Sequence, residues 1–212
     1  QHDTTAEGTQ MPRSTPRSTW DNLDADRRLR VLRAAMAEFG RHGYSGGSLN
    51  VIAREAGVAK GSLFQYFADK FDFFAYVAEQ TSLTIFAAMV PHLDAGPMPG
   101  ESFLAFFERL VDAWIDYMHA HPLERAVTAA TTMELDPQVR QAVREPVHRL
   151  YAQGLRPLLD NAVGAGELAA DTDVDALLSM LVLRLPHRAL APFEPGLDSA
   201  LRLHGTRGRA RA

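Results

Sequence analysis

The sequence predicts an all-α protein, with a three-helix N-terminal domain over residues 20–68 and a larger C-terminal helical bundle over residues 69–205. Apolar residues recur at three- and four-residue steps along most of the chain, as on the buried face of a helix. Residues that cap or stop helices flank these periodic stretches. No stretch alternates convincingly over strand length, and the hairpin dipeptides Asn-Gly and Asp-Gly do not occur.

Composition narrows the class of protein. The chain has 212 residues, of which 46% are apolar and 23% are charged, as in ordinary globular proteins. The absence of cysteine excludes disulfides, thiolate catalysis and cysteine-ligated zinc. No apolar run approaches the ~20 residues of a membrane helix, and the polar N-terminus does not resemble a signal peptide. We therefore expect a cytoplasmic protein without a membrane partner.

The charge is unevenly distributed along the chain. Its net value is −4, but residues 1–70 hold ten Lys and Arg against eight Asp and Glu, and both lysines of the chain. The remainder is acidic, with twelve basic residues against eighteen acidic ones. This pattern favours a small basic head on an acidic body, although two lysines are few enough for chance to place them together.

The N-terminal segment and first helix are read from local composition. Residues 1–19 are rich in Thr, Ser, Pro and Gly and are expected to be a disordered tail. Asp24 or Asp26 can cap the first helix. Gly40 and Gly43 are expected to end it. Its apolar stripe is expected to consist of Leu29, Leu32, Met36 and Phe39.

The body is expected to contain longer helices. Pro91–Gly100 should be a linker, and Pro146 and Pro157 should kink or break the helix that holds them. Residues 206–212 form a basic tail. One helix should present Leu104, Phe107, Leu110, Val111, Trp114 and Met118 on a single face. The expected helices begin and end near Asp69 and Val90, Glu101 and His121, Pro122 and Asp136, Pro137 and Val163, Thr172 and Leu185, and Gly196 and His204.

The segment Ser48–Lys70 has the spacing of a helix-turn-helix. Ser48 can cap a short helix over Leu49–Ala56, and a second short helix should cover about Lys60–Phe67. Gly57 lies between them and can adopt the positive φ that a tight turn requires. The apolar side chains that can fill the core between these helices are Ile52, Ala53, Ala56, Val58 and Leu63. In such a motif the second helix enters the DNA major groove.

The run AREAGVAKGSLFQYFADK resembles the DNA-binding signature of TetR-type transcriptional regulators, and the preceding LRAAMAEFGRHGY resembles that family's first helix. The close resemblance covers about residues 27–75. It implies a homodimeric regulator that binds a palindromic, double-stranded operator and responds to a small-molecule effector. It implies neither an enzyme nor a cofactor. A repressor is favoured, and an activating or ligand-independent regulator of the same fold is the alternative.

The resemblance assigns phosphate contacts to four residues. Ser48 would offer its hydroxyl and backbone N–H, Tyr66 its hydroxyl and Lys70 its ammonium group, while Asn50 would reach a phosphate or a base edge. Position 64 is Phe where the family usually has Tyr. This change removes one phosphate contact or replaces it with an apolar contact to a thymine methyl group. The alternative is that Phe64 belongs to the core.

The resemblance assigns base reading to the start of the second short helix. Lys60 can donate to guanine O6 and N7, Gly61 lets the backbone come close, and Ser62 completes the turn. Gln65 can pair with adenine or another base edge. Phe67 is assigned to the core.

The body carries no catalytic or metal-binding signature. The resemblance places an effector pocket among its middle helices, and a helical-bundle enzyme or carrier is the disfavoured alternative. Trp114, Tyr117 and Tyr151 are the strongest pocket candidates because each combines an apolar face with a hydrogen-bonding group. A dimer interface is expected within Val174–Leu203. The full set of pocket candidates is Phe86, Met89, Phe107, Trp114, Tyr117, Met118, Met133, His148 and Tyr151.

Overall fold

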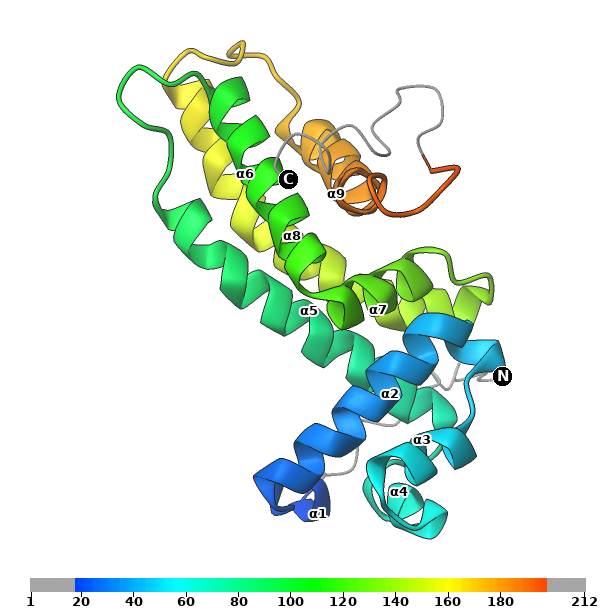
Figure 1. The fold of residues 1–212 in the computed structure, drawn as a ribbon. Helices are drawn as coiled ribbons and strands as arrows, with labels where there is room; N and C mark the ends of the chain where they lie inside the picture. The colour runs from blue at the N-terminus through cyan, green and yellow to red at the C-terminus, as the bar shows by residue number, and fades with distance from the viewer. Residues whose placement is uncertain (1–17, 198–212) are drawn as a thin grey trace, which may run out of the picture.

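The computed structural model describes residues 18–197, and all secondary structure in that range is helical (Figure 1). The tail expected at residues 206–212 and most of the helix expected at 196–204 lie outside the described residues. So does the N-terminal tail, except for Ser18 and Thr19, which are helical. The helices are α1 (Ser18–Asp21), α2 (Ala25–Gly46), α3 (Leu49–Ala56), α4 (Lys60–Tyr66), α5 (Lys70–Asp94), α6 (Phe103–Ala120), α7 (Pro122–Thr132), α8 (Pro137–Gly164) and α9 (Val174–Leu190).

Helix α2 begins as expected but turns a different face to the core. The Asp24 carboxylate accepts the Arg27 N–H at 3.0 Å and caps the helix. Val31, Ala35 and Phe39, at four-residue steps, are fully buried. By contrast Leu29 is 48% exposed, and the expected stripe is therefore displaced around the helix. Two apolar series overlap in this sequence, and packing against α7 and α3 selects the one that is buried.

Gly40 does not end α2, which continues to Gly46. At Gly43 the backbone leaves helical geometry, with φ +65° and ψ −171°, and a kink there separates two helical stretches, so the expected end of the first helix at Gly43 is confirmed. Gly40 instead marks a close approach of α2 to α7: a Cβ atom placed on it would lie 2.7 Å from the Ala126 Cβ. No side chain larger than hydrogen fits there without moving one helix.

The turn between α3 and α4 has the expected geometry. Ser48 caps α3, and Gly57 ends it in the left-handed region with φ +67°. Asp69 then accepts the Asp72 N–H at 2.8 Å, while the Asp72 carboxylate accepts the Ala68 N–H at 3.0 Å. This reciprocal cap fixes the direction in which α5 leaves α4.

Trp20, on α1, is part of the core of the N-terminal domain. The sequence did not predict this core position. Trp20 is fully buried, and its indole N–H donates to the Tyr76 hydroxyl at 2.7 Å. Its ring packs against Tyr66 and Phe67, with centroids 5.5 and 5.1 Å away. A single tryptophan in a short polar segment shows no periodicity, so sequence patterns could not place it.

The body helices tolerate more proline than expected. Helix α5 continues through Pro91 to Asp94, α8 runs unbroken through Pro146 and Pro157, and α9 continues through Pro186 to Leu190. The expected breaks are therefore wrong. On α6 the buried face includes Phe106 and Ile115, whereas Leu104 is 66% exposed.

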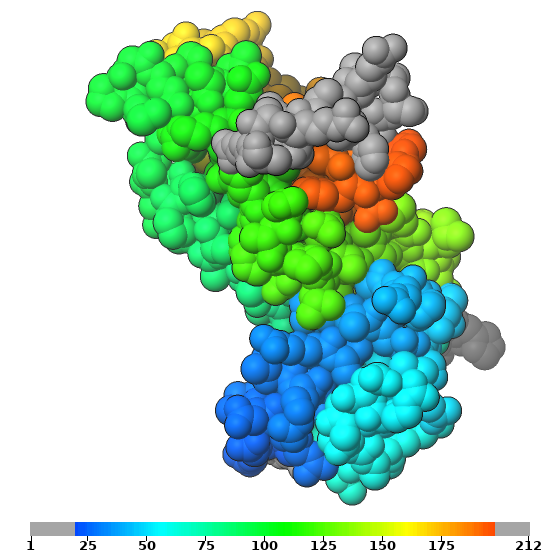
Figure 2. Space-filling model, viewed as in Figure 1, coloured from blue at the N-terminus to red at the C-terminus, as the bar shows by residue number. Residues whose placement is uncertain are grey.

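Two hydrophobic cores occupy the two ends of the molecule, and α5 contributes to both. Phe73, Phe74 and Val77 lie in the core shared with α2–α4, and Ile85 and Met89 in the core shared with α6, α8 and α9. The space-filling view shows α1–α4 as a blue-to-cyan lobe at one end, with the body above it (Figure 2). Helix α7 lies where the two meet (Figure 1).

By length and composition alone, α5 could cross a membrane, contrary to the expectation from sequence that no segment would. A buried core helix of a soluble protein meets the same criteria of length and apolar composition. Because its buried residues are divided between two cores, we interpret α5 as such a core helix.

Candidate DNA interface and effector pocket

Helix α4 separates cleanly into a buried and an exposed face. Leu63 is 1% exposed and faces the core, as does Tyr66. Lys60, Gly61 and Gln65 are exposed on the opposite side, together with Phe64. The N-cap residue, Ala59, has no side chain that could cover the first turn. These four exposed residues therefore form one outward face, with Ser62 half-buried beside it.

The aromatic pair on α4 divides differently from the expectation. Phe64 is 49% exposed, so it is not a core residue, and its ring is available to a partner. Tyr66 is only 8% exposed and packs on Trp20. The expected role of Tyr66 as a phosphate ligand is thus secondary to packing. Phe67 is 2% exposed and belongs to the core, as predicted.

The start of α3 offers less to a phosphate than expected. The Ser48 hydroxyl accepts the Val51 N–H at 3.5 Å, in its role as cap. The backbone N–H of Ser48 donates to Glu38 Oε1 at 2.9 Å, so it is not free for a phosphate. Asn50 is exposed in the first turn of the helix.

Lys70 is held at the junction of α5 and α2. Its Nζ donates to the Ser45 carbonyl at 3.0 Å and lies 4.9 Å from the centre of the Tyr44 ring. An ammonium group has three N–H donors, so two remain for a phosphate. The contact to Ser45 fixes the position of the charge rather than neutralising it.

The body contains an apolar chamber between α5, α6 and α8, with a cavity volume of about 40 Å³. Trp114 lies in its wall, and Nε1 of Trp114 is buried without a hydrogen-bond acceptor among the described residues. The chamber is lined by Ile85, Phe86, Met89, Leu93, Leu110, Val111, Trp114, Tyr151, Gly154, Leu155 and Leu185. An unsatisfied indole N–H in an apolar wall can donate a hydrogen bond to an acceptor atom of a ligand.

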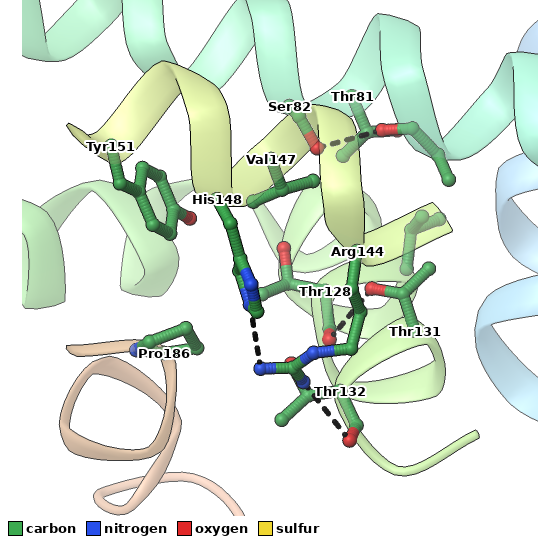
Figure 3. Close-up of a pocket in the computed structure, with 12 residues that line it drawn as sticks. Thr81, Ser82, Thr128, Thr131, Thr132, Arg144, Val147, His148, Tyr151 and Pro186 are labelled. Atoms are coloured by element: carbon green, nitrogen blue, oxygen red, sulfur yellow. Dashed lines mark hydrogen bonds between the residues drawn. The ribbon is translucent and has the colours of Figure 1, made fainter. Parts of the chain in front are cut away.

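A polar chamber of about 20 Å³ lies beside it, between α5, α7 and α8 (Figure 3). Arg144 and His148 project into it from α8, and the lining also holds several hydroxyl groups from α5 and α7. Tyr151 belongs to the lining of both chambers. Burial lowers the pKa values of Arg144 and His148, and each is lowered further by a neighbouring arginine.

The structure brings together only some of the residues proposed for the pocket. Phe86, Met89 and Trp114 line the apolar chamber, His148 the polar one and Tyr151 both. The other four lie elsewhere: Met118 is core, Met133 is 46% exposed, Phe107 stacks on Phe103 and Tyr117 stacks on His121. Arg144 was missed because an exposed arginine and one facing a chamber look alike in the sequence.

Two family models match the chain. Residues 31–77 match the N-terminal domain of "bacterial regulatory proteins, tetR family", and residues 102–203 match a "tetracyclin repressor-like, C-terminal domain". The chain belongs to the TetR family. Its resemblance extends through both halves, as an all-helical regulator with an N-terminal helix-turn-helix, and the family consists of regulators rather than enzymes.

Curated relatives of this TetR-family protein are also regulators. The HTH-type transcriptional repressor SCO4008 of Streptomyces coelicolor is 35% identical over 95 residues, which cover 45% of this chain and 44% of that protein. The match thus spans less than half of the repressor's length. The uncharacterized regulator YezE of Bacillus subtilis is 28% identical over 152 residues, or 71% of this chain and 78% of that protein.

Solved structures share the fold. FadR from Bacillus subtilis, crystallised with stearoyl-CoA, superposes with a TM-score of 0.66 at 18% identity, over 77% of this chain and 85% of that one. A gamma-butyrolactone receptor described as ArpA-like superposes with a TM-score of 0.56 at 26% identity, over 78% of this chain and 80% of that one.

Proposed function

We propose that this TetR-family protein is a cytoplasmic repressor that binds a palindromic operator as a homodimer and leaves it when a small effector occupies the body. The observation that carries the proposal is the outward face of α4. Lys60, Gly61, Phe64 and Gln65 are exposed together on a helix whose other side is locked into the core. Such a face fits a major groove.

The contacts proposed on this face have distinct roles. Lys60 and Gln65 would read base edges, and Phe64 would contact a thymine methyl group. Lys70, fixed by Ser45, would hold a phosphate. Asn50 would contact a phosphate or a base edge. Tyr66 would support α4 mainly by packing in the core, and only the small exposed part of its side chain would lie near the DNA backbone.

The homodimer is proposed to form through α9 and the adjoining part of α8. Met180 is 63% exposed and Leu183 is 53% exposed on α9, although both are apolar. Exposed apolar side chains that cluster on one helix favour a protein interface. Residues 198–203, the rest of the proposed interface, lie outside the described part of the chain.

Effector binding is proposed in the two chambers, of which the polar one adjoins the contact between body and head. Helix α7 contributes Val127, Thr128 and Thr131 to the polar chamber, while its Ala126 touches Gly40 of α2. A ligand that displaced α7 would therefore shift α2. The solved relatives that bind stearoyl-CoA and a gamma-butyrolactone support a small-molecule effector.

The function is tested by selecting duplexes that bind the protein from a random DNA library and sequencing them. We expect a palindrome with two half-sites. Gln65→Ala should relax preference at one position of each half-site, by about 1–3 kcal/mol. Lys70→Ala should weaken binding to all duplexes and lower the salt slope by about one. Absence of any enriched sequence would refute the proposal.

The alternative, a regulator that activates transcription or acts without a ligand, is tested in a second assay. Candidate ligands are titrated into the protein–operator complex of the parent and of Trp114→Ala. If Trp114 lines the effector site, the variant keeps its operator affinity and loses its response. Loss of operator binding by the variant would instead make Trp114 a structural residue, and an unaltered response would place the site elsewhere.

A further inference from the structure

Arg144 is a half-buried cation without an acidic partner. Its Nη1 donates to the Thr132 carbonyl at 3.2 Å, and its Nη2 lies 3.1 Å from His148 Nε2. Both partners are neutral. None of the ion pairs among residues 18–197 includes Arg144. Burial is the main cause that lowers the pKa of Arg144, Tyr151 opposes this shift, and the charge of Arg140 adds to it. A cation that loses solvent without a counter-ion is unfavourable, so this position suits an incoming anion.

The other polar groups of the chamber decide which donors an anion would find. The hydroxyls of Thr81, Ser82, Thr128 and Thr131 each donate to a carbonyl of their own helix. A hydroxyl has one proton, so these four can only accept. These four hydroxyls cannot donate to an anion, so Arg144 is the main group in the chamber that could bind one.

The remaining donors are His148, Tyr151 and the hydroxyl of Thr132, which also lines the chamber and is hydrogen-bonded to no described residue. Because Arg144 donates to His148 Nε2, the neutral imidazole carries its proton on Nδ1. Burial and the Arg144 charge lower the His148 pKa, which keeps the ring neutral. Burial raises the pKa of Tyr151, whose hydroxyl stays protonated and has no hydrogen-bond partner among the described residues. The chamber thus offers one positive charge and three neutral donors, which suits a single negative charge.

The second half of the ligand is indicated by the neighbouring apolar chamber. Tyr151 lies between the two, packed edge-on against Trp114 with centroids 5.1 Å apart. Phe86 and Leu155 continue the wall away from Arg144. A molecule with its charge at Arg144 would therefore extend past Tyr151 into surroundings that are apolar except for the indole N–H of Trp114.

We infer that the effector is an amphipathic monocarboxylate, with its carboxylate on Arg144 and its apolar part in the chamber lined by Phe86, Trp114 and Leu155. This inference rests on the proposed effector site and names the class of ligand. In the present structure the chambers hold about 20 and 40 Å³, space for little more than water. Binding must separate α5, α7 and α8, and this difference between the empty and filled forms is what a release mechanism requires.

The probes are octanoate, decanoate and dodecanoate, each compared with the primary alcohol of the same length by isothermal titration calorimetry on the full chain. We expect at least one acid to bind ten or more times as tightly as its alcohol. In Arg144→Gln the acid should weaken by at least tenfold while the alcohol is unchanged. Arg140→Gln is the matched control, because Arg140 is exposed one turn earlier on α8. It should retain the parent's preference.

Equal binding of acid and alcohol by the parent would overturn the inference, as would an Arg144→Gln variant that still prefers the acid, or no binding of any acid. Unchanged alcohol binding in Arg144→Gln shows that this variant is folded. If Arg144→Gln does not fold, Arg144→Lys replaces it in the test and should keep part of the parent's preference for the acid. Operator release is measured separately. Arg144-dependent acid binding without release leaves the site in place and refutes only the ligand-released repressor.

Discussion

The contact between Gly40 and Ala126 is the point at which the head meets the body, and it can be tested with one methyl group. In Gly40→Ala the new Cβ would lie 2.7 Å from the Ala126 Cβ, 3.2 Å from its carbonyl carbon and 3.3 Å from the Val127 nitrogen. Ordinary carbon contacts begin near 3.5 Å, so the helices must separate by roughly 0.5–1 Å. Backbone atoms are among the obstacles, and no rotamer change can relieve them.

Two opposing terms set the size of the effect. Overpacking of this kind costs about 1–3 kcal/mol. Replacing glycine by alanine within a helix returns roughly 1 kcal/mol. We therefore expect Gly40→Ala to lower the free energy of unfolding by about 0–2 kcal/mol. Its effect on operator affinity should exceed that, because the two heads of a dimer must match a fixed half-site spacing.

A double-mutant cycle separates these terms. Ala126→Gly removes the facing methyl group and costs about 1 kcal/mol through helix propensity alone. In the double variant the shortest contact, the one at 2.7 Å, is gone and only the backbone contacts at 3.2 and 3.3 Å remain, so urea denaturation should give a favourable coupling energy of about 1–3 kcal/mol. Operator affinity should recover in parallel. Strict additivity of the two substitutions would refute the proposed contact.

Three further predictions follow from described contacts. Trp20→Ala should lower the free energy of unfolding by about 3–5 kcal/mol in urea denaturation, because it empties a fully buried site and leaves the Tyr76 hydroxyl without its donor; a loss below 1 kcal/mol would show that α1 is not packed. Gly57→Ala should cost about 1–2 kcal/mol because its φ is +67°, with Gly57→Asn less harmful, and equal stability of both would contradict the left-handed turn. His148 has a lowered folded-state pKa, so the unfolded chain binds the additional proton and stability should fall as the pH drops below the ordinary histidine value near 6.5; His148→Gln should flatten that part of the stability profile, and an unchanged profile would mean that the ring is not buried.

Local chemistry made the head predictable. Ser48, Gly57 and Asp69 each have a role that neighbouring backbone groups determine: a cap, a left-handed turn and a second cap. Such roles depend on a few adjacent residues and can be read without knowing the fold. The family resemblance then connected these positions to DNA, which spacing alone would have left as a helical hairpin.

Tertiary contacts account for the errors. A proline within a helix costs about 3 kcal/mol, and Pro146 and Pro157 were expected to kink or break α8 for that reason. Valines and leucines buried on both sides of each proline hold α8 in register instead. The choice of Val31 over Leu29 for the buried face also depends on the partner helix. In the pocket, Arg144 became a candidate only when the structure showed it without an acidic partner.

The shared use of α5 has a consequence for anyone who would transplant this DNA-reading head. A cut at residue 68 leaves α1–α4 without Phe73, Phe74 and Val77, which form one wall of their interior. Val127, Val139 and Val143, from α7 and α8, lie in the same interior. The head therefore cannot be exchanged between proteins by itself. A chimaera must carry the first half of α5 and a matching surface from the recipient body. Without them the exchanged domain will expose apolar core residues and aggregate.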